Sequence, residues 1–284
     1  MKSVLVTGAS GGVGRATVRR LEERGWRVFA AVRSLDAARD LGAVPVELDV
    51  TDIDSIASVR EAVAARVGAA GLQGLVNNAG VSVDGPLELV TVAALRRQFE
   101  VNVVGQVTVT QAFLPLLRAG RGRVVNMGGA AGRVPLPMYG ALSASKAALD
   151  ALSDALRMEL RHQGVRVSYI EPGGLNTSFF DTAANAQRRD GYAGSAETQA
   201  IYVEAIEAAA SALAGSRSSP VERAVRAIER ALTDRRPAHR YLVGRDARFV
   251  LPLLRRLPAT VRDRLVMDSL GLTRETFRQH GENR

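Results

Sequence analysis

The chain has 284 residues, of which 46% are apolar and 24% charged, the composition of an ordinary globular protein. It contains no cysteine, which excludes a disulfide scaffold, a cysteine-ligated zinc site and a thiol nucleophile. No apolar run reaches the roughly 18 residues that a membrane-spanning helix needs. Because the first predicted strand starts at about Ser3, we expect no signal peptide, and a cytoplasmic protein is the default expectation.

The net charge of +9 would by itself suggest a nucleic-acid partner. Residues 1–214 hold 22 basic and 21 acidic side chains, whereas residues 215–284 hold 16 arginines and 8 acids. The excess therefore belongs to the C-terminal quarter, and with no groove-binding motif we expect no nucleic acid. An Arg-rich helical tail with apolar residues on its other face is compatible with a membrane surface, an acidic carrier protein or another subunit, and equally with a plain solvated helix.

Short apolar runs alternate with longer amphipathic segments through the first 170 residues. The runs predict strands at 3–7, 27–32, 44–48, 72–76, 123–127 and 165–170, and the amphipathic segments predict helices at 12–24, 52–67, 91–118 and 140–162. Continuous apolar strands that alternate with helices predict a parallel sheet covered on both faces. Right-handed crossovers make this an α/β fold with a Rossmann-type doubly wound sheet.

The pattern changes after Pro172. Residues 177–215 are rich in Ala, Ser, Asn and Gln and predict short helices or a mobile segment, while 220–234 is amphipathic and 240–243 is a candidate last strand. Residues 246–280 read as apolar–Arg helices broken by Pro252 and Pro258. Without a repeat or a linker, we expect one domain: a dinucleotide-binding core (1–177), a helical lid (178–239), and the last strand with basic C-terminal helices (240–284).

The run Thr7–Gly14, TGASGGVG, follows the first strand and opens a helix. Gly8 permits a tight turn, Gly12 lets the backbone approach a pyrophosphate, and Gly14 permits close packing of helix on strand. The helix N-terminus offers free N–H groups and the positive end of its dipole to phosphates. The residues that we expect to bind a dinucleotide here are Gly8, Ser10, Gly11, Gly12, Val13 and Gly14.

The second strand ends at Val32-Arg33, where an enzyme that binds NAD would place a carboxylate for the ribose 2′-hydroxyl. A guanidinium binds a 2′-phosphate through two hydrogen bonds. Arg33 therefore favours NADP(H) as the cofactor.

These residues resemble the short-chain dehydrogenase/reductase family, and the resemblance covers about residues 2–177. TGASGGVG looks like the cofactor loop of that family, Asp49-Val50 like the pair that meets the adenine, and Asn78-Ala79-Gly80 like the motif that stabilises the sheet. Arg33 resembles the NADP-preferring branch that includes 17β-hydroxysteroid and retinol dehydrogenases. The resemblance implies a bound nicotinamide cofactor.

Further along the chain, Asn102 looks like the family's asparagine that helps to hold a proton-relay water. Pro172-Gly173 and Thr177 look like the loop that holds the nicotinamide amide. The tail from Arg240 onward also resembles that of bacterial members.

The family's reaction uses a tyrosine four residues before a lysine, and a serine thirteen residues before that tyrosine. Lys146 is present, but Leu142 and Gly129 occupy the tyrosine and serine positions. Leucine and glycine can neither protonate nor polarise a substrate oxygen, so ordinary carbonyl–alcohol interconversion is in doubt. Tyr139 is the nearest candidate replacement, although an aromatic wall of the pocket is the simpler interpretation. The candidate catalytic residues are thus Asn102, Lys146 and Tyr139.

Three hypotheses follow. The first is a reductase whose substrate, an iminium ion or an enone, needs no acid from the protein. The second is a cyclase, isomerase, dehydratase or lyase that keeps a nicotinamide cofactor bound without consuming it. The third is a protein without catalysis that reports the NADPH/NADP⁺ ratio to a partner. Engineered substitution at Gly129 or Leu142 is a further open interpretation.

The substrate pocket is expected to be mostly apolar and to take a small molecule of polyketide, terpenoid, steroid or alkaloid size. Its expected lining is Gly129, Met138, Tyr139, Leu142, Leu175, Phe179 and Phe180, with Tyr192 and Tyr202 nearby.

The long helices at 91–118 and 140–163, the second with a stripe of alanines at 147, 148, 151 and 155, favour a homo-oligomer, either a dimer or a tetramer. His162, His239 and His280 form no ligand spacing, so no metal is expected.

Overall fold

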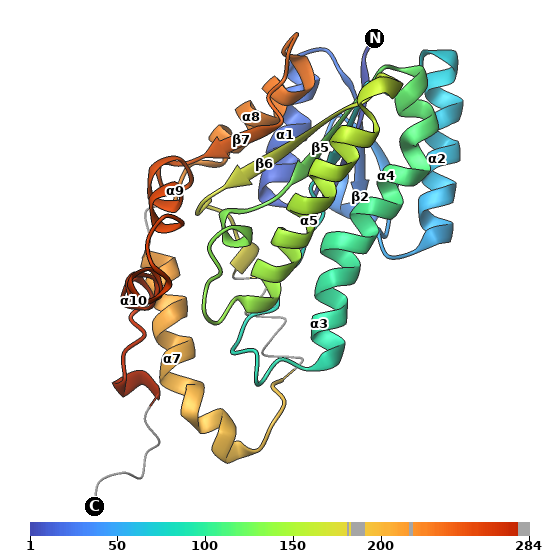
Figure 1. Ribbon diagram of the computed structural model, residues 1–284. Helices are drawn as coiled ribbons and strands as arrows, with labels where there is room; N and C mark the ends of the chain where they lie inside the picture. The colour runs from blue at the N-terminus through green and yellow to red at the C-terminus, as the bar shows by residue number, and fades with distance from the viewer. Residues whose placement is uncertain (181, 183–190, 216–217, 278–284) are drawn as a thin grey trace, which may run out of the picture.

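The computed structural model describes residues 1–180, 182, 191–215 and 218–277. Seven parallel strands form one sheet in the order β3-β2-β1-β4-β5-β6-β7 (Figure 1). The order reverses between β1 and β4, so the crevice at their carboxyl ends is the expected ligand site of a doubly wound sheet. The strands are β1 Ser3–Thr7, β2 Arg27–Val32, β3 Val44–Glu47, β4 Gly74–Asn77, β5 Arg123–Met127, β6 Arg166–Pro172 and β7 Arg240–Val243.

Helices cover both faces of the sheet, as the strand pattern predicts (Figure 1). Apolar residues of α1 and α8 pack with Val4 and Val6 on one face, and those of α2 and α4 pack with Leu5 on the other. Alternate residues of the buried strand β1 thus face opposite layers. The helices are α1 Gly12–Glu23, α2 Ile53–Val67, α3 Val92–Phe99, α4 Gly105–Ala119, α5 Gly140–Glu159, α7 Ala196–Gly215, α8 Val221–Thr233, α9 Leu251–Leu254 and α10 Ala259–Ser269.

The helix predicted at 91–118 is a continuous helical segment that changes type in its middle. Thr91 caps α3 by accepting a hydrogen bond from the N–H of Ala94, at 3.1 Å. A π-helical turn at Glu100–Val104 separates α3 from α4 and contains the buried Asn102. A π turn inserted in a helix is frequent at functional sites, and here it carries a predicted site residue.

Two sequence-based predictions about the chain after Pro172 differ from the structure. Short helices or a mobile segment were predicted for 177–215; residues 181 and 183–190 of this range lie outside the described residues, and residues 196–215 form the single long helix α7. Its alanines suit a helix, and its apolar residues are spread around it rather than gathered on one face. Pro252 does not break a helix either, because it lies at the start of α9, directly after the π turn Asp246–Val250.

The chain between β6 and α8 leaves the sheet and returns at one point. Leu175 and Ser219 form an isolated parallel bridge, in which the N–H of Ser219 donates to the carbonyl of Gly174 at 2.8 Å and the N–H of Asn176 donates to the carbonyl of Ser219 at 3.1 Å. We call residues 176–218 the excursion. Its described part contains α7, which Figure 1 places beyond the carboxyl ends of the strands.

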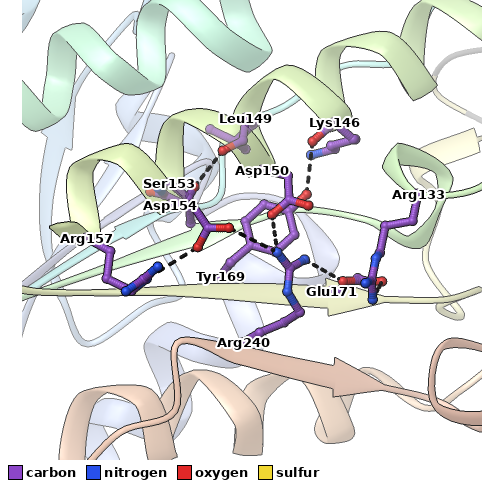
Figure 2. A network of polar contacts seen from close by, with 11 residues as sticks. Arg133, Lys146, Leu149, Asp150, Ser153, Asp154, Arg157, Tyr169, Glu171 and Arg240 are labelled. Carbon is purple, nitrogen blue, oxygen red and sulfur yellow. Dashed lines mark hydrogen bonds and ion pairs between the residues drawn. The ribbon is translucent and has the colours of Figure 1, made fainter. Parts of the chain in front are cut away.

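Arg240 fastens the edge strand β7 to β6 and α5 (Figure 2). Its guanidinium donates to the fully buried carboxylate of Glu171 at 2.7 Å and to Asp150, and it stacks 5.0 Å from the ring centroid of Tyr169. Arg133 is a second cation for Glu171, at 3.4 Å. Two guanidinium groups therefore compensate a carboxylate that could not be buried alone.

Among the described helices, none is long and apolar enough to cross a membrane.

Candidate active site

Glycines bring the loop after β1 against the loop after β4. Gly8 has a φ of +62°, and a Cβ built there would lie 2.9 Å from the Cα of Ala79. A Cβ on Gly14 would lie 2.2 Å from the carbonyl oxygen of Gly8, so a side chain at either position would force the backbones apart. This is the close approach of helix to strand that the motif predicts.

The first turn of α1 is open for an anion. Gly11 is its N-cap and has no side chain, so no side-chain oxygen caps the N–H groups of Gly12, Val13 and Gly14. Ser10 and Gly11 are exposed beside it. Free N–H groups at a helix N-terminus are suited to a phosphate, so this part of the structure fits the pyrophosphate of a dinucleotide.

Thr7 and Asn78 lock the two loops together. The hydroxyl of Thr7 accepts hydrogen bonds from the N–H groups of Asn78 and Ala79, both at 3.0 Å. The side-chain amide of Asn78 donates to the carbonyls of Thr7 and Gly8, at 3.0 and 3.1 Å. The predicted cofactor residues Asn78 and Ala79 thus lie directly against the glycine loop, where Asn78 acts as a structural brace, while Gly80 lies against Asn102.

The loop after β6 also lies beside the glycine loop. A Cβ on Gly12 would lie 3.1 Å from the methyl group of Thr177, so the predicted nicotinamide loop faces the predicted phosphate loop. Asp246 fixes the other side of this loop: its carboxylate accepts from the N–H of Gly174 at 2.8 Å and fills the space beside Gly173, which follows the buried Pro172. Asp246 lies outside the family motifs, and only the fold reveals its role.

Arg33 and Asp49 mark the adenosine side of the crevice. Arg33 is exposed at the carboxyl end of β2. The Asp49 carboxylate accepts from the N–H of Thr51 at 2.9 Å and from its hydroxyl at 2.7 Å. These bonds lower the pKa of Asp49, and the nearby charge of Arg33 lowers that pKa further. Val50 is buried, so of the predicted adenine pair it is Asp49 that lies near the predicted phosphate-binding arginine.

Lys146 lies inside the protein, between α5 and β5. Its ammonium group donates to the carbonyl of Met127 at 2.8 Å, and burial lowers the pKa of Lys146 to about 8. Asn102 is buried close by, but its amide is occupied: it accepts from the N–H of Val81 at 2.8 Å and donates to the carbonyl of Val81 at 2.9 Å and to Ser145 at 3.2 Å. A water held by Asn102 stays a prediction.

Gly128 and Gly129 have different physical reasons to be glycine. A Cβ on Gly128 would lie 1.9 Å from the Tyr169 ring, so that ring requires a glycine there. Gly129 has an extended backbone with a φ of 174°, and a Cβ would lie 3.6 Å from the Cγ of Lys146, an ordinary contact. Packing therefore does not exclude a serine at position 129. The hydroxyl of Tyr169 donates to the carbonyl of Lys146 at 3.1 Å, which uses its proton inside the fold.

Leu142 lies on α5, one turn before Lys146, and its side chain is 4% exposed. It belongs to an apolar cluster, which we call the aromatic cluster, that also includes Met138 and Tyr139 with Phe179 and Phe180 packed against them. The Tyr139 ring meets the Phe180 ring edge to face at 5.4 Å. Five of the seven predicted pocket residues are thus brought together.

Two predicted features of the pocket differ from this picture. Leu175 packs against the apolar layer beneath α1 and α8, apart from the aromatic cluster, because the bridge to Ser219 holds it at the sheet. Tyr139 is buried as the N-cap of α5, and burial together with the negative charge of Asp84 raises its pKa above that of a free tyrosine. A raised pKa makes the hydroxyl a weaker proton donor, which argues against Tyr139 as the replacement acid.

Asp84 is an ionisable residue near Tyr139 that the sequence-based reasoning did not single out. It is half-buried, accepts a hydrogen bond from the Ser82 hydroxyl at 2.5 Å, and has a pKa raised to about 6 by burial. The next residue, Gly85, donates its N–H to the carbonyl of Met138 at 2.7 Å, which holds this loop against the start of α5. An isolated acid in a loop has no spacing pattern, so only its proximity to Tyr139 identifies it.

The described residues include no group of His, Cys, Asp and Glu side chains that could hold a metal ion. His162 and His239 lie away from the site, and His280 lies outside the described residues.

Comparison with known proteins agrees with this geometry. A model of the short chain dehydrogenase family matches residues 2–188. The crystal structure of a short-chain dehydrogenase from Streptomyces avermitilis superimposes with a TM-score of 0.76 at 31% identity, over 95% of this chain and 97% of that one. A second one, from Burkholderia cenocepacia in complex with NADP, has a TM-score of 0.72 at 28% identity, over 93% of this chain and 99% of that one. The chain belongs to the short-chain dehydrogenase/reductase family of oxidoreductases.

Two relatives in sequence carry named activities. Rat (Rattus norvegicus) retinol dehydrogenase 7 is 36% identical over 278 residues, which are 93% of this chain and 87% of that protein. The 3-amino-tetrahydro-pyrrolizinone reductase of Xenorhabdus hominickii is 42% identical over 182 residues, which are 63% of this chain and 64% of that protein. This chain therefore matches less than two thirds of the pyrrolizinone reductase, and the match lies within a shared family rather than across two whole proteins.

Proposed function

We propose that this protein is an NADP(H)-dependent reductase of a small, mostly apolar molecule that takes up hydride without a proton from the enzyme, an iminium ion or an enone. One observation carries the proposal: the cofactor crevice keeps its glycine loop, its Asn78 brace and Lys146, while Leu142 and Gly129 stand where the family places its acid and its polarising hydroxyl. Retention of the cofactor site favours a reaction that uses the cofactor.

NADP(H) is the expected cofactor for two reasons. The exposed Arg33 at the end of β2 suits a 2′-phosphate, and no carboxylate occupies that position. The similar protein from Burkholderia cenocepacia was solved with NADP. The uncapped first turn of α1 would hold the pyrophosphate, and Lys146 would donate to the nicotinamide ribose.

The absence of the family's tyrosine and serine limits the class of substrate that the protein can reduce. Bound NADPH supplies a hydride. A ketone that accepts a hydride becomes an alkoxide, and it needs a proton that Leu142 cannot give. An iminium carbon accepts the hydride while the electrons of the C=N π bond become a lone pair on nitrogen, so no proton is required. An enone can take the hydride at carbon and a proton later from water. The name of the pyrrolizinone reductase, whose substrate carries an amino group, supports a nitrogen-containing substrate.

The test is a substrate panel with purified protein and NADPH. Cyclic iminium ions, enones and ketones are added in turn, NADPH absorbance is followed, and products are identified by mass spectrometry. We expect NADPH oxidation with iminium or enone compounds and little with ketones. Absence of oxidation across the whole panel would refute the proposal. A product formed while NADPH stays constant would identify the second hypothesis, a non-redox enzyme, in its place.

The assembly is part of the proposal. We expect a homo-oligomer that pairs through α4 and α5, where Ala147 and Ala151 are exposed. Light scattering that gives the mass of a single chain would contradict it. Contacts of the basic C-terminal helices with a membrane surface or an acidic carrier remain an expectation, for which exposed Phe249 and Leu253 are the apolar candidates.

A further inference from the structure

Among the residues that the structure describes, no cation is paired with the ionisable side chain of Asp84. Its only hydrogen-bonding side chain among the described residues is Ser82, at 2.5 Å, and the ion pairs of the described part of the chain do not include it. Burial of a carboxylate without a positive partner is costly, and proteins keep such groups mainly where a ligand supplies the missing charge. The Ser82 hydroxyl offers one hydrogen bond and no charge, so most of that cost stays uncompensated.

The fold places this carboxylate at the aromatic cluster. The N–H of Gly85 bonds to Met138, and Gly85 pairs with Tyr139 in an isolated bridge. Tyr192 packs on the same glycine from the excursion, because a Cβ on Gly85 would lie 2.5 Å from its ring. Burial raises the pKa of both tyrosines, and the negative charge of Asp84 raises both further.

The same cluster contains the position of the missing acid. Tyr139 lies three residues before Leu142, which is about one helical turn. Asp84 thus precedes a glycine that lies against the rings of Tyr139 and Tyr192, and Tyr139 packs in the same cluster as Leu142. Aromatic rings around a carboxylate are the side chains that recognise a positively charged nitrogen, through the face of the ring and through the opposite charge.

We propose that Asp84 binds the positively charged nitrogen of the substrate, which makes the site specific for a cyclic iminium compound over a neutral compound of the same shape. This inference rests on the proposed function and names its substrate class. A neutral ketone would leave Asp84 unpaired in the complex, and that cost discriminates against it.

Asp84 is a specificity residue with a predictable kinetic signature. Hydride addition forms the new C–H bond with the hydride electron pair, and the π pair of the C=N bond moves to nitrogen, so the charge that Asp84 binds disappears in the product. Asp84 therefore stabilises the substrate more than the transition state. Asp84→Asn should raise KM for an iminium substrate about 10- to 100-fold and leave kcat unchanged or higher.

The pH dependence follows from the same group. Its pKa of about 6 applies to the free pocket, and a bound cation lowers it, so binding is strongest above about pH 6 and weakens as the pH falls below that value. Among the described residues, the groups that face Asp84 are Ser82 on its own loop, Tyr139 at the start of α5 and Tyr192 on the excursion. Neither tyrosine titrates near neutral pH, because both have a raised pKa.

The test measures binding without turnover, so that it can fail independently of the proposed reductase activity. Benzyltrimethylammonium has a fixed positive charge, and neopentylbenzene is its neutral isostere. Calorimetric titration of the NADP⁺-loaded full chain should give at least about tenfold tighter binding for the cation at about pH 8, with the preference lost near pH 5. Asp84→Asn should abolish this preference. Glu88→Gln, which removes an exposed acid that bonds Tyr202, should retain it.

Each outcome is decisive. Equal binding of the two probes, binding of neither, or a cation preference that survives in Asp84→Asn would overturn the inference. Ser82→Ala serves as a second variant that keeps the carboxylate: loss of its hydrogen bond should raise the pKa of Asp84 and move the pH profile upward. A cation preference without NADPH oxidation in the substrate panel would leave the inference standing and refute the reductase.

Discussion

Reinstalling the missing hydroxyls tests whether their absence is what limits ketone reduction. The double substitution Gly129→Ser with Leu142→Tyr puts the family's pair back beside Lys146. The serine meets no obstacle, since the backbone of Gly129 is extended and a Cβ would lie 3.6 Å from the nearest atom of Lys146. The tyrosine is harder, because Leu142 is only 4% exposed and packs in the aromatic cluster. Overpacking of this kind costs about 1–3 kcal/mol.

The expected gain is large enough to measure. General acid catalysis contributes about 10²–10⁴-fold, so kcat/KM for a cyclic ketone with NADPH should rise at least about 100-fold over the parent. Leu142→Phe together with Gly129→Ser is the matched control, since it adds the same ring and the same steric cost without the hydroxyl. Urea unfolding and NADPH binding of both variants establish that they are folded.

The reasoning is refuted if both variants fold and bind NADPH but reduce the ketone equally slowly. That result would mean that the pocket excludes ketones for another reason, and the pairing of Asp84 with a cationic substrate would be the first one to test.

The cofactor site and the ion pairs give three further predictions. Arg33→Ala should raise KM for NADPH about 10- to 100-fold and leave KM for NADH nearly unchanged, because only NADPH carries the phosphate; equal effects on both would place the phosphate elsewhere. Arg240→Met should lower the free energy of unfolding by about 3–5 kcal/mol in urea, since it removes the closest cation from buried Glu171, and Arg240→Met with Glu171→Gln should recover part of it. The third concerns Lys146, whose pKa is lowered to about 8 in the folded protein, below the unfolded value of about 10.4. Between these two pH values the unfolded chain binds more protons, so stability should rise with pH there, and Lys146→Met should abolish the rise in urea titrations.

The parts of the fold that depend on local pattern were predictable from the sequence. The strands Ser3–Thr7, Arg27–Val32, Arg123–Met127 and Arg240–Val243 were predicted to the residue, because buried parallel strands are short unbroken apolar runs. The strand predicted at 72–76 is displaced to Gly74–Asn77, since an apolar run does not say where pairing begins.

Only those parts of the site that are formed by contiguous sequence motifs could be predicted from the sequence. The glycine loop and the Asn78 motif are contiguous in sequence, and their contacts follow from their order along the chain. Asp84, Asp246 and Tyr169 interact with residues that are distant in sequence. Because no local sequence pattern marks them, their contacts are known only from the folded structure. The length of α7 was missed for a related reason, because its alanines give no amphipathic pattern and its packing against the C-terminal segment is long-range.

The bridge between Leu175 and Ser219 holds the two ends of the excursion together at the sheet, so the length of the excursion can change without a change in the sheet. At the sheet and at the start of α8, the chain between β6 and α8 is closed by this bridge, and the bridge does not depend on the length of the excursion. The entropy of closing a longer loop grows only logarithmically, so a change in the length of the excursion costs the sheet little. Thr177 belongs to the predicted cofactor loop, and the excursion packs on α5 and on the C-terminal segment. A chimera for redirecting this scaffold should therefore keep Thr177 and exchange the excursion together with the C-terminal segment that packs on it.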